Sequence, residues 1–189
     1  ERGADAVVID CEDATPSGAK EEARANVRNV VPDILADNMQ VFVRVNSVAS
    51  SFFEADVSEG LVSGLAGIVV PKLETLAQAD DVARIFDRAE AAFGGLDAVV
   101  ANAGIVAPAM ALAQTTPDRL ERMVRVNLLG ALLVAREAAR RLPREDGVTT
   151  SLTLMSSAAA RLGSPGEFVD YAASKGAIDT LTLGLAKEL

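Results

Sequence analysis

The most informative part of the sequence runs from Leu152-Thr153-Leu154-Met155-Ser156-Ser157 to Tyr171-Ala172-Ala173-Ser174-Lys175. Its apolar start predicts a buried strand that ends at a serine pair. Tyr171 and Lys175 are about one helical turn apart, so they share one face of the predicted helix. The apolar stripe of that helix, traced back from Ile178, follows the same face. A lysine there is costly unless it is paired or takes part in chemistry, and the simpler alternative is a lysine that extends to solvent at the helix start.

A second polar residue falls on an apolar stripe. Thr116-Pro117 predicts an N-cap followed by proline in the first helical turn. The helix that follows carries apolar residues at helical spacing as far as Leu142, and Asn127 lies in the middle of that stripe. A buried amide needs hydrogen-bond partners. Asn127 therefore either caps a neighbouring loop or belongs, like Lys175, to a functional site.

Four motifs in a fixed order point to a known family. They are Gly95-Leu96-Asp97-Ala98-Val99-Val100-Ala101-Asn102-Ala103-Gly104, Val126-Asn127-Leu128-Leu129-Gly130, Ser156-Ser157, and Tyr171 to Lys175 with Gly176-Ala177. From about Asp80 to Leu189 the chain resembles the short-chain dehydrogenases/reductases. The resemblance implies a catalytic group of Asn127, Ser157, Tyr171 and Lys175, and cofactor binding by Asn102, Ala103, Gly104, Tyr171 and Lys175. The usual Asn-Asn-Ala-Gly reads Ala101-Asn102-Ala103-Gly104, and the spacing to Tyr171 leaves Ser156 as an alternative to the preferred Ser157.

These residue types suit hydride transfer between a nicotinamide, NAD or NADP, and a small alcohol or carbonyl substrate. The reaction needs a proton delivered to, or taken from, the substrate oxygen. A free phenol, with a pKa of about 10, is a poor base at neutral pH. A lysine ammonium one turn away favours the phenolate, and a serine hydroxyl can donate to the substrate oxygen. The resemblance further implies that Lys175 binds the cofactor ribose and that Asn127 holds a water that links Lys175 to solvent.

Composition narrows the classes of function. The 189 residues are 50% hydrophobic, which is enough for one sizeable core. A formal charge of −9 argues against nucleic acid or an anionic membrane surface as partner. The chain has one cysteine, Cys11, and no histidine, which excludes a disulfide framework, His-based triads and His-containing metal sites. No apolar run approaches the roughly 20 residues of a membrane span, so we expect a cytoplasmic protein.

Apolar runs alternate with amphipathic stripes along the whole chain. The expected strands are residues 6–9, 41–45, 67–70, 97–101 and 152–155. Helical stripes are expected over residues 23–34, 53–65 and 82–93, in addition to the two helices described above. Strands this uniformly apolar predict an α/β fold, a parallel sheet of alternating βα units in a Rossmann-like three-layer sandwich with helices on both faces.

Residues 1–75 lack the signature of a dinucleotide-binding start. A Gly-x-x-x-Gly-x-Gly loop, which lets a pyrophosphate lie on a helix N-terminus, occurs nowhere in the sequence. This segment resembles instead the HpcH/HpaI aldolase and citrate lyase beta-subunit family, a barrel of β/α units. The resemblance is carried by residues 3–14 (Gly-Ala-Asp-Ala-Val-Val-Ile-Asp-Cys-Glu-Asp-Ala), Val43-Arg44-Val45-Asn46, Phe53-Glu54-Ala55-Asp56 and Gly67-Ile68-Val69-Val70-Pro71-Lys72-Leu73-Glu74.

In that family an arginine at the position of Arg44 binds the substrate carboxylate, a task suited to a bidentate cation. Glu12 and Asp13 would form part of an acidic active-site mouth. Alternatively, Arg44 pairs structurally with Glu12 or Asp13, and Lys72-Leu73-Glu74 is only a loop. The family's magnesium carboxylates come from later strands that have no counterpart here. Magnesium is therefore expected only under this interpretation, and no metal-binding residue is assigned.

We therefore expect two segments of different ancestry, residues 1–75 from a barrel family and residues 76–189 from a dehydrogenase family. The dehydrogenase-like segment has no counterpart of the glycine loop or of the part that follows the helix after Lys175. The unbroken βα alternation suggests that both segments contribute to one open sheet. The functional hypotheses are an NAD(P)-dependent oxidoreductase, a magnesium-dependent carbon–carbon lyase, and a non-catalytic hybrid chain. The dehydrogenase resemblance also implies a homo-oligomer, because its two long helices form a dimer face in that family.

Overall fold

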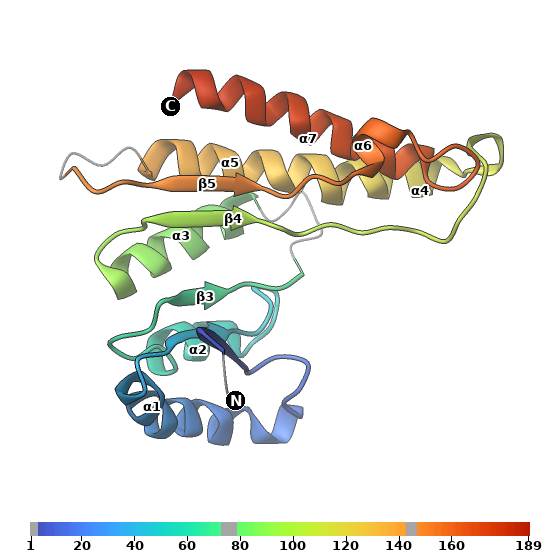
Figure 1. The fold of residues 1–189 in the computed structure, drawn as a ribbon. Helices are drawn as coiled ribbons and strands as arrows, with labels where there is room; N and C mark the ends of the chain where they lie inside the picture. Colours follow the sequence, from blue (N-terminus) through green and yellow to red (C-terminus); the bar gives the residue numbers. More distant parts are fainter. Residues whose placement is uncertain (1–3, 73–78, 143–146) are drawn as a thin grey trace. The chain divides into compact units, whose positions relative to one another are not determined.

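The computed structural model describes residues 4–72, 79–142 and 147–189, and the chain divides into two compact units (Figure 1). The first unit comprises Glu1–Lys72 and Arg84–Gly95, and the second comprises Leu73–Ala83 and Leu96–Leu189. Helix α3 (Ala79–Phe93) contributes its larger part to the first unit. Each unit has a parallel sheet of its own.

The first unit is built on a three-stranded parallel sheet of order β1-β2-β3. In the register of this sheet Val8 pairs with Phe42, and Phe42 pairs with Gly67. Its elements are β1 (Ala6–Asp10), η1 (Ser17–Ala19), α1 (Lys20–Ala36), β2 (Gln40–Arg44), α2 (Phe53–Glu59) and β3 (Gly67–Val69), together with the greater part of α3.

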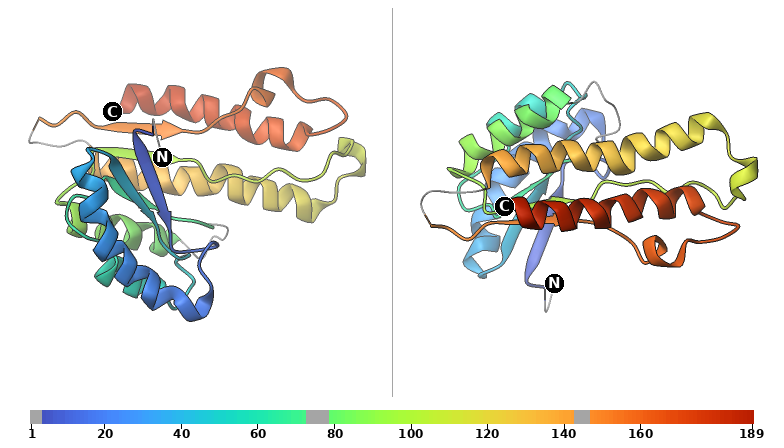
Figure 2. Two further views of the ribbon diagram at one scale, coloured as in Figure 1. Left: turned by 60° about the horizontal axis from the view of Figure 1, so that its bottom comes forward. Right: turned by 90° about the horizontal axis from the view of Figure 1, so that it is seen from above.

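One face of this sheet is buried beneath helices, because side chains alternate between the two faces of a strand. Val41 and Val43 of β2 are buried, as are Val27 of α1 and Phe53 of α2. Figure 2 shows α1 running alongside the strands. On the opposite face Val8 is 56% exposed. The sheet is therefore less covered than its uniformly apolar strands predict.

A buried polar network joins α1, α2 and the segments that follow β1 and β2. The Asp56 carboxylate, on a residue 2% exposed, accepts hydrogen bonds from the backbone N–H and side-chain amide of Asn46 at 2.7 and 2.6 Å. It also pairs with Arg24 at 3.2 Å. The Asn46 amide and the Lys20 ammonium both donate to the Cys11 carbonyl, at 3.1 and 2.8 Å. Asp56 thus neutralises the buried Arg24, although Arg24 Nε has no hydrogen-bond partner among the described residues.

We predict that Asp56→Ala lowers the free energy of unfolding by about 3–5 kcal/mol, because it leaves the Arg24 guanidinium buried without its partner. Urea unfolding measures the effect. Glu59→Gln is the matched control: its carboxylate is 58% exposed and lies 3.7 Å from the same guanidinium. The control should change stability by about 0–1 kcal/mol. Equal losses in the two variants would contradict the prediction.

The second unit is built on a two-stranded parallel sheet, in which Ala98 pairs with Ser151 and Ala101 with Leu154. Its strands are β4 (Ala98–Ala101) and β5 (Ser151–Leu154), and its helices are η3 (Leu112–Gln114), α4 (Pro117–Val124), α5 (Gly130–Arg141), α6 (Ala159–Leu162) and α7 (Val169–Glu188). Helices α5 and α7 lie side by side over one face of this sheet (Figures 1 and 2). Val100, on the opposite face, is 60% exposed.

Helices α4 and α5 form one rod that is interrupted by a π-helical turn, η4 (Arg125–Leu129). The rod begins as predicted: the Thr116 hydroxyl accepts a hydrogen bond from the Arg119 N–H at 3.3 Å, and Pro117 occupies the first turn. The π-turn is the departure from the expected uninterrupted helix. Such turns are frequent at functional sites, and this one contains Asn127.

The α/β class with parallel strands is confirmed, and every expected strand is present with small shifts of its ends. The expected single merged sheet is wrong for the described residues, whose strands pair into two sheets. Along the chain, α3 follows β3 and packs onto the first unit, where its Arg88 pairs with Glu54 at 2.9 Å, and no described strand pairs with β3 apart from β2. The helix expected over residues 53–65 ends at Glu59, with Gly60 as its C-cap residue, and the chain turns through the left-handed region farther on, at Gly64, with φ +92°.

A buried carboxylate near the end of α5 is surrounded by arginines of its own helix. Glu137 accepts a hydrogen bond from Arg140 at 2.9 Å and another from Arg141. Arg136 lies 3.9 Å away. The hydrogen bond from Arg141 is the main cause that holds the pKa of Glu137 below its ordinary value, against the opposing effect of burial.

This lowered pKa predicts an acid-sensitive contribution to stability. A carboxylate whose pKa is lower in the folded than in the unfolded state stabilises the fold above its ordinary pKa of about 4.3. The contribution is lost as the pH falls through the folded-state value. Urea unfolding at pH 7 and at successively lower pH should therefore show a smaller decline in Glu137→Gln than in the wild type. Parallel curves for the two proteins would refute the assignment.

Candidate functional site

Lys175 lies on α7 with its ammonium in the interior of the second unit. The residue is 4% exposed, and its Nζ donates a hydrogen bond to the Met155 carbonyl, directly after β5, at 2.7 Å. The ammonium lies 5.9 Å from the centre of the Tyr171 ring. The alternative of a lysine extended into solvent is therefore wrong. An ammonium has three N–H donors, and among the described residues the Met155 carbonyl is the one hydrogen-bond acceptor.

Asn127 holds the chain that follows β4. Its Oδ1 accepts from the Ile105 N–H at 2.7 Å, while Nδ2 donates to the Ile105 carbonyl at 2.9 Å and to the Ser174 hydroxyl at 3.1 Å. Asn127 therefore caps the neighbouring loop, as one of the two expectations from the sequence stated. Both N–H groups of the amide are engaged, so a water that links Asn127 to Lys175 would need the backbone carbonyl or the second lone pair of Oδ1.

The Gly104 backbone approaches these two side chains closely. A Cβ atom at this position would lie 3.3 Å from Lys175 Nζ and 3.5 Å from Asn127 Oδ1. Gly104 does not adopt a positive φ, so glycine is favoured here by the close contact and not by backbone freedom. Asn102, Ala103 and Gly104 are all exposed directly after β4. The backbone beside the lysine is therefore open to a ligand.

The two serines after β5 have different hydrogen bonds. The Ser156 hydroxyl donates to the Lys175 carbonyl at 3.2 Å. The Ser157 oxygen accepts from the Ala159 N–H at 3.2 Å, which leaves its proton uncommitted among the described residues. A residue that donates to a substrate oxygen needs that proton. The geometry therefore favours Ser157 over Ser156 for this role.

Tyr171 is half-buried, and none of the described residues hydrogen-bonds its hydroxyl. The preceding residue, Asp170, binds Arg119 of α4 through two hydrogen bonds, at 2.8 and 3.2 Å. The hydrogen bond from Arg119 lowers the pKa of the Asp170 carboxyl, and the same bond raises the pKa of Arg119. This ion pair fixes the first turn of the helix that carries Tyr171.

The structure thus brings Lys175, Asn127 and Gly104 together, and places the Tyr171 ring near the ammonium. No hydrogen bond among the described residues joins Ser157 to these groups. Sequence reasoning did not single out Arg119, Asp170 and Ser174. An acid before the tyrosine and a serine on the inward stripe were weak signals, and nothing in the sequence marked Arg119 as their partner.

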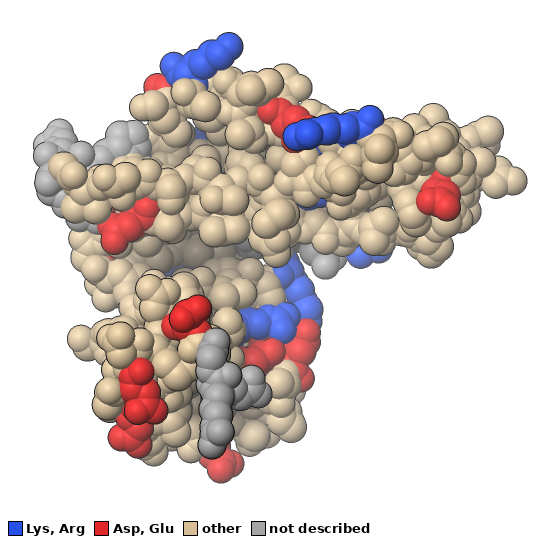
Figure 3. Space-filling view, viewed as in Figure 1, with Lys and Arg blue, Asp and Glu red and all other residues tan. Residues whose placement is uncertain are grey.

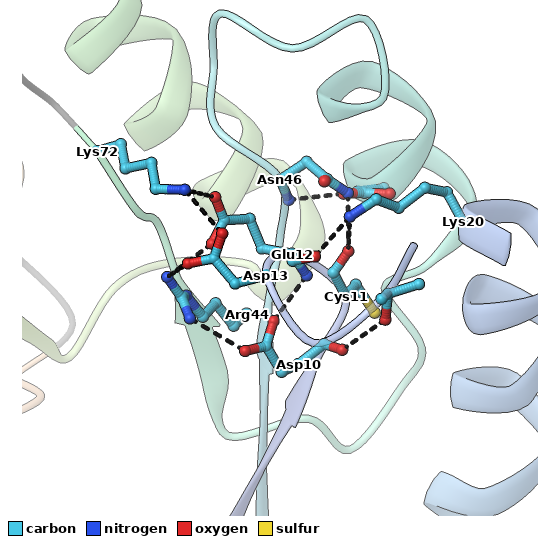
Figure 4. Close-up of polar contacts among 10 residues, drawn as sticks. Asp10, Cys11, Glu12, Asp13, Lys20, Arg44, Asn46 and Lys72 are labelled. Carbon is cyan, nitrogen blue, oxygen red and sulfur yellow. Dashed lines mark hydrogen bonds and ion pairs between the residues drawn. The ribbon is translucent and has the colours of Figure 1, made fainter. Parts of the chain in front are cut away.

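A second cluster of charges lies at the carboxyl ends of β1, β2 and β3 in the first unit (Figure 4). Arg44 contacts Asp10 at 3.0 Å, Glu12 at 2.6 Å and Asp13 at 3.3 Å. Lys72 contacts Glu12 at 2.5 Å and Asp13 at 2.8 Å. Figure 3 shows blue and red side chains adjoining on this face of the first unit. Arg44 therefore pairs with Glu12 and Asp13, as the structural alternative predicted.

Electrostatics in this cluster favour the charged forms. The hydrogen bond from Lys72 is the main cause of the lowered pKa of Asp13, and that bond also raises the pKa of Lys72. Burial opposes the charge on Arg44, but the neighbouring carboxylates outweigh it and raise the pKa of Arg44. Lys72 adopts φ +57°, a left-handed conformation that costs a non-glycine residue of order 1–3 kcal/mol and often marks functional sites.

Two further properties concern the whole described chain. Over residues 4–72, 79–142 and 147–189, His, Cys, Asp and Glu side chains form no group of three or more that could hold a metal ion. No helix in these ranges is long and apolar enough to cross a membrane.

Comparison with protein families finds one match that covers most of the chain. The model described as HpcH/HpaI aldolase/citrate lyase matches residues 1–149, which extends well beyond the segment expected from the sequence. A citrate lyase subunit beta-like protein of Deinococcus radiodurans is 48% identical over 87 residues, 43% of this chain and 30% of that protein.

Other relatives carry the names of oxidoreductases. The oxidoreductase YgfF of Escherichia coli (strain K12) is 47% identical over 95 residues, 50% of this chain and 38% of that protein. A short-chain type dehydrogenase/reductase of Picea abies is 40% identical over 118 residues, 60% of this chain and 41% of that protein. The chain thus spans less than half the length of these curated relatives.

Solved structures share the fold. One described as "ElxO with NADP Bound" has a TM-score of 0.60 at 24% identity, and the match covers 85% of this chain and 62% of that one. At this identity the likeness concerns the arrangement of the backbone alone.

We predict that Asn127→Leu removes the protection of the Ile105 N–H against hydrogen exchange, because leucine fills the space but cannot accept its hydrogen bond. The free energy of unfolding should fall by about 1–3 kcal/mol, since polar groups lose their partners. Ser174→Ala is the control: it removes one acceptor of the Asn127 amide and leaves both bonds to Ile105 in place. Exchange of Ile105 should stay slow in this variant, as measured by NMR. Slow exchange in Asn127→Leu would contradict the prediction.

Proposed function

The chain belongs to the HpcH/HpaI aldolase/citrate lyase family, and we propose that its second unit performs NAD(P)-dependent oxidation of an alcohol or reduction of a carbonyl, in the manner of a short-chain dehydrogenase/reductase. One observation carries the proposal: the buried Lys175 ammonium lies near the Tyr171 ring, with the backbone of Gly104 close beside it. Relatives named as oxidoreductases and the NADP bound to ElxO support it.

Each side chain of the proposed site has a defined task. When an alcohol is oxidised, its O–H bond breaks and the proton passes to the oxygen of the Tyr171 phenolate. A bound nicotinamide would accept the hydride from the carbon. The Lys175 ammonium lies beside the Tyr171 ring, and the Ser157 hydroxyl donates to the substrate oxygen. Asn127 holds the turn that the cofactor would approach. Carbonyl reduction moves the same proton and hydride in reverse.

The residues present fit one end of such a cofactor. The exposed Gly104, whose missing side chain lets the backbone approach Lys175, lies beside an ammonium with N–H donors to spare for a ribose hydroxyl. Asn102 and Ala103 present exposed backbone at its edge. The phosphate end lacks its usual support, since the sequence contains no Gly-x-x-x-Gly-x-Gly loop. We therefore expect weak binding, with the choice between NAD and NADP left to the experiment.

Titration with NADH and NADPH, read by nucleotide fluorescence, tests the proposal. We predict binding by millimolar concentration, and reduction of a small carbonyl such as 4-nitrobenzaldehyde. Tyr171→Phe should abolish turnover, because the phenol oxygen that carries the proton is gone, and should change cofactor affinity by less than about twofold. Absence of binding by either nucleotide would refute the oxidoreductase proposal, and retained turnover in Tyr171→Phe would remove this residue from the mechanism.

The serine pair provides a matched control for the same assay. Ser157→Ala should lower turnover by about 10²–10³-fold, the loss typical when one donor to a developing oxyanion is removed. Ser156→Ala removes a hydroxyl that already donates to the Lys175 carbonyl, so its effect should be much smaller. The reverse order of the two effects would assign the role to Ser156.

A second candidate is the carbon–carbon lyase activity of the family itself. It is favoured by Arg44 and Lys72, which meet Glu12 and Asp13 at the carboxyl ends of the strands, with Lys72 in a strained conformation. The described residues do not offer a magnesium site, and we derive no step through that metal. Cleavage of a malyl thioester in the presence of magnesium would support this candidate. Loss of that cleavage in Arg44→Gln would place the activity at the charge cluster around Arg44.

The third hypothesis, a non-catalytic hybrid chain, becomes the conclusion if neither nicotinamide binding nor thioester cleavage is found. Under the favoured proposal the protein acts in the cytoplasm on a small molecule and forms a homo-oligomer. Light scattering coupled to size exclusion measures the last property directly.

A further inference from the structure

The first turn of α7 has an unusual attachment. Its N-cap residue, Phe168, supplies no side-chain hydrogen bond to the free N–H groups of the helix start. Helix starts without such a cap tend to fray. Asp170, in this first turn, instead has a carboxylate 4% exposed that is bound by Arg119 of α4, whose side chain is 13% exposed. An ion pair from a neighbouring helix therefore holds this turn.

The geometry of Arg119 extends the attachment to a third segment. Its Nε and one terminal nitrogen bind the two oxygens of Asp170 at 2.8 and 3.2 Å, and the other terminal nitrogen donates to the Pro108 carbonyl at 2.7 Å. Only the planar fork of an arginine makes these three bonds at once, because a lysine ammonium cannot match both carboxylate oxygens in one plane. Arg119 thus joins α4, α7 and the segment after β4.

We propose that Arg119 and Asp170 are positioning residues that hold the Tyr171 ring at its place beside Lys175. Tyr171 follows Asp170 directly, and its hydroxyl has no hydrogen-bond partner among the described residues, so the ring depends on the backbone for its position. Lys175 is fixed separately, through its bond to the Met155 carbonyl. The distance between ring and ammonium is therefore set by how firmly the first turn is held. The catalytic meaning of this distance rests on the proposed function, but the positioning itself does not.

The composition of the chain offers a direct probe. Tyr171 is the one tyrosine in the sequence, and there is no tryptophan. A sample with ¹³C-labelled tyrosine therefore gives the NMR signals of this ring alone. Nuclear Overhauser cross peaks from the ring to the Lys175 methylenes report the contact without cofactor or substrate, and thermal unfolding of the same samples reports stability separately.

We expect Arg119→Met and Asp170→Asn to lose the ring–lysine cross peaks while the other methyl and amide signals of the unit persist. Arg119→Lys keeps the charge but not the fork, and should retain weakened cross peaks. Arg136→Met, which changes an exposed arginine of α5, is the matched control and should leave them unchanged. If turnover is detected in the wild type, kcat should fall by about 10²-fold in Arg119→Met with KM little changed, as for a misplacement of about 1 Å.

Unchanged cross peaks in folded Arg119→Met and Asp170→Asn would overturn the proposal, even if both variants melt at a lower temperature, because a purely structural pair affects stability alone. If Arg119→Met does not fold, the cross peaks of Asp170→Asn and Arg119→Lys decide instead: unchanged cross peaks in both would overturn the proposal. Failure of nicotinamide binding would refute the proposed function and leave this result standing, since the cross peaks are measured on the protein alone.

Discussion

The hydrogen bond from the Lys175 ammonium to the Met155 carbonyl organises the second unit. A cation on a residue 4% exposed has to find acceptors inside the protein, and the carbonyl that follows β5 is the acceptor it finds. The helix is thereby tied to the end of the strand. The same ammonium favours a glycine at position 104, where a Cβ would approach it to 3.3 Å. Asn127 then holds the adjoining turn in place through Ile105.

The first unit meets the same demand in a different way. Its buried Arg24 is neutralised by Asp56, and Arg44 and Lys72 meet the carboxylates of Asp10, Glu12 and Asp13. These three cations are paired with anions. Lys20 of the first unit and Lys175 of the second are instead both held by neutral backbone carbonyls. The Tyr171 ring and the exposed backbone of Gly104 lie close to the Lys175 ammonium. This surrounding is the physical reason for placing the favoured chemistry in the second unit.

The positions of Lys175 and Asn127 on apolar helix stripes predicted that both are buried. The alternation of apolar runs with amphipathic helical stripes predicted the strands. The sequence did not predict the part played by Arg119 and Asp170, because a salt bridge between residues 51 positions apart leaves no local pattern. Two sheets instead of one also escaped prediction, since periodicity identifies strands but not their neighbours. The π-turn left a faint trace: Met123, Asn127, Ala131 and Ala135 are all buried, at a constant spacing of four. A regular α-helix would drift by about 40° at each such step.

That turn confines the consequences of an added or lost residue to its own surroundings. A π-helical turn holds one residue more than the surrounding helix needs. Deleting one residue of Arg125–Leu129 would leave Met123 and Ala131 seven positions apart, about 700° of regular winding, so both would stay on one face. During divergence a single-codon loss here would therefore leave both ends of the rod buried and would alter the setting of the asparagine alone.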